Sequence, residues 1–287
     1  MFYQRRNLQV LLCTLEFPKN KQTNKMRRKS ILVTKLAFFI ACMIPVLMST
    51  VNTFVENGKN IENTFRALKY RPQNDSCGVT VTLMIEYMLF TVYMEYPLLF
   101  ATCMCAVVHI YELYLLHLNN DLKEKNAINL SAKLSNILND YNNIEEKIRL
   151  LSDTLSTSLF IILLISFCNL FTILAYCLTN VIPRFLLYEL CANGFISLII
   201  IYSVTIYCSA IPENMLKIKK TAVKLIDDCV LSELENRKCL TFLERIANKD
   251  IIYISAGGVL DFKKSFLLSA LGTILTYGLL ILNQQRI

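Results

Sequence analysis

The side chains best suited to chemistry lie in the last apolar stretch of the chain, Phe266 to Leu282, which carries no charge. Small and polar residues form a stripe within it, namely Ser269, Gly272, Thr273, Thr276, Tyr277 and Gly278. Contact with lipid tails alone does not explain such a stripe. We therefore expect the stripe to face a protein neighbour or water. As a helix rising about 1.5 Å per residue, the stretch nearly crosses a bilayer. Such a helix could form the functional part of a channel or a receptor.

Acidic residues inside apolar runs are the second unusual feature. A charge in lipid is costly, so Glu86, Glu95 and Glu189 should face a cavity, a partner or the membrane interface. For Glu86 and Glu189, near the ends of their runs, the interface alone is a sufficient explanation. Glu95 lies deeper and is the better candidate for lining a pocket.

Tyrosines and amides in the apolar runs could complete a small-molecule site between helices, because buried hydroxyls need hydrogen-bond partners. An interfacial tyrosine belt or plain core packing explains any one of them as well. The candidate ligand-binding residues are Glu86, Tyr93, Glu95, Tyr96, Asn169, Tyr176, Asn193 and Tyr202.

No pattern typical of an enzyme or of a metal or cofactor site is found. The two histidines, His109 and His117, are eight residues apart and do not share a helix stripe. Most of the 11 cysteines lie in apolar runs or basic segments, which is typical of packing residues or reduced thiols rather than disulfides. We therefore expect no catalytic residues, no metal and no cofactor.

Composition indicates an all-α membrane protein. Hydrophobic residues make up 54% of the 287, only 18% are charged, and the mean hydropathy is +0.44. The charges are clustered between apolar runs, each long enough to cross a bilayer. The five predicted spans are Ile31–Val55, Val79–Leu116, Leu155–Leu178, Phe185–Ile211 and Phe266–Leu282.

The second run is too long for one crossing, since its helix would measure about 57 Å against a hydrocarbon core of about 30 Å. Splitting it at Pro97 would place most of the 30 Lys and Arg residues outside, whereas one projecting helix places most of them inside. Glu95-Tyr96-Pro97 is also a poor hairpin turn. We therefore predict a single helix that Pro97 kinks.

The resulting organisation is a transmembrane helical bundle with helical extensions in the cytoplasm. The segments are a basic cytoplasmic 1–30, four spans within 31–211, a cytoplasmic helical loop at 118–154, a second at 212–264, and the last span at 265–287. Apolar residues recur at helical spacing in both loops, which predicts a packed cytoplasmic domain, with surface-lying amphipathic helices as the alternative. The N-terminus is then cytoplasmic, the C-terminus extracellular, and Asn74 lies in an outer-loop glycosylation sequon.

The last segment resembles that of the arthropod gustatory receptor family. That family ends its final span with Thr-Tyr, five apolar residues, then Gln-Phe. Here Thr276-Tyr277 matches, while Asn283 and Gln284 stand where Gln and Phe are expected. Gly257 to Asp261 and the residues after it are similar to the family's lead-in. The five spans correspond to the family's third to seventh, so the family's first two spans are expected to be missing.

The resemblance implies a ligand-gated cation channel of the plasma membrane, opened by small-molecule tastants. Four related subunits, identical or different, would assemble in lipid around a central pore lined by the last helix, and no nucleic acid would take part. Ser269, Thr273, Thr276, Tyr277 and Asn283 are the pore-lining candidates. Two alternatives stay open, a fragment of a G-protein-coupled-type receptor, which would have the opposite orientation, and a non-conducting accessory subunit.

Overall fold

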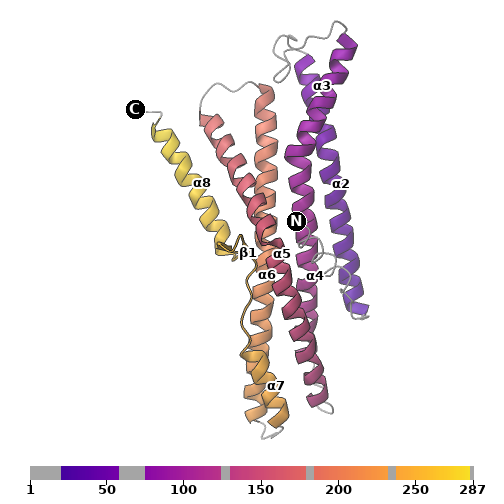
Figure 1. Ribbon diagram of the computed structural model, residues 1–287, viewed down its shortest axis with the longest axis vertical. Coiled ribbons are helices and arrows are strands. Elements are labelled where there is room, and N and C mark those ends of the chain that lie inside the picture. Colours follow the sequence, from indigo (N-terminus) through magenta and orange to yellow (C-terminus); the bar gives the residue numbers. More distant parts are fainter. Residues whose placement is uncertain (1–20, 58–74, 124–129, 179–183, 232–236, 285–287) are drawn as a thin grey trace. The chain divides into compact units, whose positions relative to one another are not determined.

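The chain is almost entirely helical in the computed structural model, which describes residues 21–57, 75–123, 130–178, 184–231 and 237–284 (Figure 1). The α-helices are α2 (Lys21–Asn57), α3 (Asp75–Phe90), α4 (Tyr96–Lys123), α5 (Leu130–Leu178), α6 (Arg184–Leu231), α7 (Arg237–Ala247) and α8 (Ser265–Gln284). A π-helix, η2 (Thr91–Glu95), joins α3 to α4, and two short strands, β1 (Ser255–Ala256) and β2 (Leu260–Asp261), precede α8. The predicted all-α class is confirmed, with this small hairpin as an addition.

Among the described residues, four helices are long and apolar enough to cross a membrane. Their apolar parts lie within Ile31–Val51, Leu83–Lys123, Leu134–Tyr176 and Tyr188–Val230, and α8 adds a shorter apolar stretch, Ser265–Leu280. Each of these overlaps one of the five runs predicted from the sequence. Helices satisfy their own backbone hydrogen bonds, which spanning a bilayer requires. The chain is therefore a multi-pass membrane protein.

Helices α5 and α6 are longer than any membrane crossing requires. They contain 49 and 48 residues, so each extends about 70 Å, against about 30 Å of hydrocarbon. Pro212 lies inside α6 without ending it. Much of the helical structure predicted for 118–154 and 212–250 is thus the continuation of apolar helices, not a set of separate elements.

The predicted single helix through Pro97 is present, and its irregularity lies just before the proline. In η2 the backbone N–H of Tyr96 donates to the carbonyl of Thr91, five residues back. A proline ring clashes with the carbonyl four residues before it, here that of Tyr93, and it removes one donor. Widening the preceding turn accommodates both effects. The helix therefore continues where a hairpin would have been needed to make two spans.

One compact unit, unit 1, contains Met104–Ile161 and Val204–Leu267. Its core is built from three helical stripes, each with apolar residues three or four apart. The buried members are Leu134, Ile137, Tyr141, Ile144, Ile148 and Leu151 of α5, Ile211, Met215, Ile218 and Ala222 of α6, and Cys239, Leu243 and Ile246 of α7. The predicted apolar faces of these helices are therefore confirmed as packed core.

A second unit, unit 2, contains Lys29–Cys103, Ile162–Ser203 and Leu268–Ile287. Its helices expose apolar side chains along most of their lengths, which is typical of a surface that faces lipid. Well-exposed examples are Leu32, Phe39, Met84, Met88, Phe195, Leu268 and Leu275.

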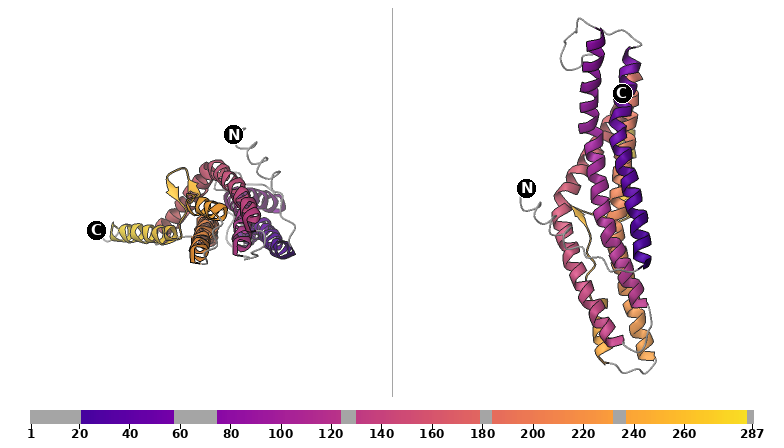
Figure 2. Two further views of the ribbon diagram at one scale, coloured as in Figure 1. Left: turned by 90° about the horizontal axis from the view of Figure 1, so that it is seen from below. Right: turned by 90° about the vertical axis from the view of Figure 1, so that its right-hand side faces the viewer.

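The two strands form an antiparallel hairpin in unit 1, with Ser255 opposite Asp261 and Ala256 opposite Leu260. Its tip contains Gly257 and Gly258, whose φ angles of +62° and +68° are strained for any other residue type. Figure 2 shows the hairpin beside the middle of α5, and the amide of Gly257 donates to the carbonyl of Ser156 at 2.9 Å. The sequence did not predict this hairpin.

Candidate functional site

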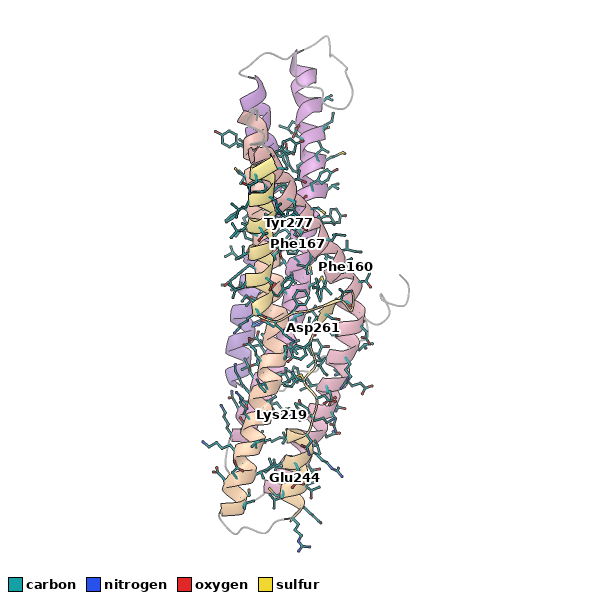
Figure 3. The ribbon with its side chains drawn as sticks, turned by 90° about the vertical axis from the view of Figure 1, so that its left-hand side faces the viewer. Phe160, Phe167, Lys219, Glu244, Asp261 and Tyr277 are labelled. Atoms are coloured by element: carbon teal, nitrogen blue, oxygen red, sulfur yellow. The ribbon has the colours of Figure 1, made fainter. Side chains whose placement is uncertain are left out.

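Helix α8 has one face that packs within unit 2. Ala270 and Gly278 are buried on it. A Cβ added at Gly278 would lie 2.9 Å from Cδ2 of Leu174, so α8 and α5 approach closely at this point. The rings of Tyr277 and Phe171 stack edge to face with centroids 5.5 Å apart, and Figure 3 shows Tyr277 on α8.

The opposite face of α8 carries the polar stripe. Ser269, Thr273, Thr276 and Asn283 are all exposed, and they recur at intervals of three, four and seven residues, which places them on one side of a helix. Nothing lies within 4 Å of a Cβ added at Gly272, in the same stripe. Four of the five predicted pore-lining residues are thus brought together. Tyr277 lies apart from them, because its ring contacts α5.

The hydroxyls of this stripe are partly satisfied by their own helix. Thr273 donates to the carbonyl of Ser269 and Thr276 to that of Gly272, both at 2.8 Å. Each hydroxyl oxygen keeps lone pairs with which it can still accept a hydrogen bond. The described residues of α8 carry no charge. The stripe can therefore offer neutral oxygen acceptors to a hydrated cation without binding it tightly.

Around η2, the structure places Glu95 against a neighbouring helix. Its carboxylate shares a hydrogen bond with the Cys42 thiol of α2, so this acidic residue does not face lipid alone. One turn earlier lies Thr91, whose buried hydroxyl has no hydrogen-bond partner among the described residues. Sequence reasoning identified Glu95 and missed Thr91, although Pro97 indicated an irregular turn at this place. A polar region therefore exists inside an otherwise apolar unit.

The other candidate ligand-binding residues are dispersed. Four tyrosines point outward and are between 45% and 68% exposed, namely Tyr93, Tyr96, Tyr176 and Tyr202. Glu86, Asn169 and Asn193 are half-buried. The eight candidates come from α3, η2, α4, α5 and α6, and the partner of Glu95 is the Cys42 thiol of α2. The assignment of the others to a ligand site stays a prediction, and Asn74 lies outside the described residues.

The chain leading into α8 is held to α5 and α6 by an ion-pair cluster in unit 1. The carboxylate of Glu145 accepts from Lys249 at 2.6 Å and from Arg149 at 2.9 Å. The ammonium group of Lys219 also donates to the carbonyl of Lys249, at 3.5 Å. Burial alone would raise the pKa of Glu145, but the two cations outweigh it, so its pKa lies below the ordinary range. Burial, with the nearby charge of Glu145, raises the pKa of Tyr141 to about 12.

Two further attachments follow along the same segment. The amide of Gly258 donates to the Ser156 hydroxyl at 3.2 Å, and the Phe160 ring lies against the hairpin tip at Gly257 (Figure 3). Lys264, one residue before α8, pairs with Glu213 at 2.8 Å. The segment 248–264 is therefore held at three places, and these contacts fix where α8 begins.

The two histidines pair with carboxylates of their own helix. In α4 the Nδ1 atom of His109 lies 2.8 Å from Glu112, and that of His117 lies 3.0 Å from Asp121. The pairs are separate, and within the described ranges no three His, Cys, Asp or Glu side chains group as metal ligands.

The long apolar helices, the π turn and the final short helix define a polytopic helical membrane fold that is also found in insect olfactory receptors. The chain is similar to OR5 from Machilis hrabei in complex with eugenol, with a TM-score of 0.73 and 15% identity over 97% of this chain and 74% of the receptor. It is similar to a second structure of the same receptor with a TM-score of 0.65 and 17% identity, over 98% and 75%. No family model and no curated protein match the sequence. At these identities, the likeness shows the fold.

Proposed function

We propose that this chain is a subunit of a chemosensory, gustatory-type channel that a small molecule opens to cations. The observation that carries the proposal is the division of α8 into a face packed on α5 and an outward stripe of Ser269, Thr273 and Thr276. Polar side chains that face lipid are disfavoured, so this stripe needs water or another subunit. The shared fold with an olfactory receptor supports a chemosensory role.

In the proposed assembly four related subunits, identical or different, place their α8 helices around a central pore in the plasma membrane. The neutral oxygens of the stripe then replace part of a cation's water shell. Asn283 adds an amide at the outer end of the path. Unit 1, with its packed core, projects into the cytoplasm and holds the start of α8 through segment 248–264.

The ligand site of this proposal lies around η2 in unit 2, where Thr91 and Glu95 supply polar groups beside α2. One solved relative in fold holds eugenol, and a small molecule with a hydroxyl group would suit an unpaired threonine oxygen. A ligand that prefers the open state shifts the population toward it by its difference in affinity.

Current recording tests the proposal directly. The chain is expressed alone and together with a related full-length receptor subunit, and a panel of small molecules that includes eugenol is applied. We expect a cation current in at least one combination. A chain that reaches the cell surface and gives no current in either combination would contradict the channel role. Altered currents only with a partner would favour an accessory subunit.

A further inference from the structure

The α6–α7 hairpin of unit 1 brings two thiols together. The C-terminal part of α6 lies beside α7 (Figure 1). Ile218, Ala222 and Cys229 share one side of α6, and Cys239, Leu243 and Ile246 share one side of α7. All of them except the half-buried Cys229 are buried. Cys229 and Cys239 share a side-chain hydrogen bond. Cys239 is only 2% exposed, whereas Cys229 is half-buried and so within reach of small solutes.

Three of the six other cysteines with described side chains are placed differently. Cys103, Cys168 and Cys191 are exposed on the apolar helices of unit 2, where lipid would surround them. Thiolates, not thiols, react with oxidants, and lipid disfavours thiolates. The Cys229–Cys239 pair therefore combines a neighbouring sulfur, which a disulfide needs, with a place outside the five predicted spans, where a thiolate can form.

We propose that Cys229 and Cys239 form an oxidisable dithiol that closes into an intrachain disulfide when the cell meets a peroxide or a disulfide oxidant. The Cys229 thiolate attacks one oxygen of hydrogen peroxide, which breaks the O–O bond and gives a sulfenic acid and hydroxide. The Cys239 sulfur then attacks the Cys229 sulfur, the S–S bond forms, and water leaves with the Cys239 proton. The two cysteines lose two electrons in total, which peroxide accepts. Glutathione disulfide does the same by exchange, releasing two glutathione thiols.

The consequence is a covalent tie between the C-terminal part of α6 and the N-terminal part of α7. Both helices belong to the core that holds segment 248–264, so the tie restrains the part of the chain that leads to α8. Burial and the neighbouring Cys229 raise the pKa of Cys239. Closure should therefore be slow near neutral pH and faster as the pH rises.

Peptide mapping tests the proposal on the full chain in membranes. The membranes are treated with hydrogen peroxide, free thiols are blocked with N-ethylmaleimide, and the chain is digested with trypsin without reduction. Cleavage after Arg237 and Lys238 puts the two cysteines on different peptides, so a disulfide appears as one linked mass that reduction separates. We expect this mass in the wild type and in the control variant Cys103→Ser, and its loss in Cys229→Ser and Cys239→Ser.

Sequence proximity alone could also produce such a link. The equilibrium constant for the disulfide is therefore compared between the folded chain and the chain in denaturant, at a fixed ratio of reduced to oxidised glutathione. We expect the equilibrium constant for the disulfide to be about tenfold or more higher in the folded chain. Equal constants would overturn the proposal, as would folded chains in which both thiols are recovered as maleimide adducts after peroxide treatment.

Discussion

Unit 1 and unit 2 use the same residue types in opposite ways. Unit 1 buries its leucines and isoleucines and exposes charged residues such as Lys238 and Glu244. Unit 2 leaves Leu32 and Met88 each 69% exposed, and the charged residues among its described side chains are Lys35, Glu86, Glu95 and Glu189. The surface of unit 1 is thus typical of a protein in water, and the surface of unit 2 is typical of a protein in lipid.

This difference indicates where each unit keeps its polar groups. In unit 1 the polar groups attach one segment to another. The ion pair of Glu145 with Lys249 and the hydrogen bond to Ser156 hold the segment before α8. Unit 2 has few polar groups, and those on α8 gather on one outward face. The polar groups of unit 1 therefore stabilise it, whereas the role that we propose for those on α8 is functional.

The largest expected effect comes from making the same substitution in both units. Leu151→Ala removes a side chain that is fully buried in unit 1, and the cavity should lower the free energy of unfolding by about 2–5 kcal/mol. Leu32→Ala, on the exposed surface of α2, should change it by only about 0.5 kcal/mol. Thermal denaturation in detergent micelles measures both. Equal losses would mean that the two surfaces do not differ as described.

Next in size is strain at the hairpin tip. Gly257→Ala meets both a positive φ and the Phe160 ring, 3.2 Å from the added Cβ, and should cost about 1–3 kcal/mol. Gly258→Ala has a similar φ with nothing within 4 Å, so it should cost less. Hydrogen exchange of residues 255–261 reports the opening of the hairpin. Faster exchange in the Gly258 variant than in the Gly257 variant would contradict the docking on α5.

A smaller effect is expected at the ion-pair cluster. Lys249→Gln removes the closer, less exposed partner of Glu145 and should destabilise unit 1 by about 1–2 kcal/mol. Arg149→Gln is the matched control, since the Arg149 side chain is 54% exposed and its loss should cost about 0.5 kcal/mol. Chemical denaturation in micelles compares the two. A larger loss of unfolding free energy in the Arg149 variant would show that Lys249 is not the main partner of Glu145.

The same cluster predicts how stability depends on pH. Because the pKa of Glu145 is lowered on folding, its contribution is present above the ordinary glutamate pKa, about 4.3, and is lost as the pH falls through the lower folded value. Melting temperatures measured from about pH 6 to pH 3 should therefore fall less steeply in Glu145→Gln than in the wild type. Parallel curves would show that protonation of Glu145 does not contribute to the loss of stability at low pH.

The smallest effect concerns unit 2 and its function. Thr276→Val keeps the shape of the side chain but removes an oxygen acceptor from the outward stripe of α8. One lost polar contact of about 0.5–1.5 kcal/mol corresponds to about a two- to tenfold drop in unitary conductance. Leu275→Val, on the same helix, is the control and should leave conductance unchanged. If only the Leu275 variant altered conductance, the stripe would not be the pore lining.

Much of this fold follows from hydrophobic patterning. Apolar runs located the four long apolar helices and α8, and residues such as Ile148 and Ile218 at helical spacing located the core of unit 1. The hairpin at Ser255–Asp261 could not be found in the same way, because strands of two residues are too short for alternation.

Long-range contacts could not be predicted from the sequence, for another reason. Glu145 and Lys249 are separated by 104 residues, and nothing in local spacing specifies that pair. The site was partly accessible, since the polar stripe of α8 is a local pattern. The outward direction of Tyr93 and Tyr202, by contrast, depends on helix rotations that are set by packing.

Labelling of single positions on α8 tests the central claim most directly, because it needs no known ligand. Thr276→Cys lies on the outward stripe, and Ile274→Cys replaces a half-buried side chain near the packed face. Each variant is exposed, in intact cells, to a water-soluble, membrane-impermeant maleimide. The account predicts that the peptide carrying the cysteine at position 276 is labelled and that the one carrying it at position 274 is not. Labelling at 274 with none at 276 would contradict a water-filled path along this face of α8.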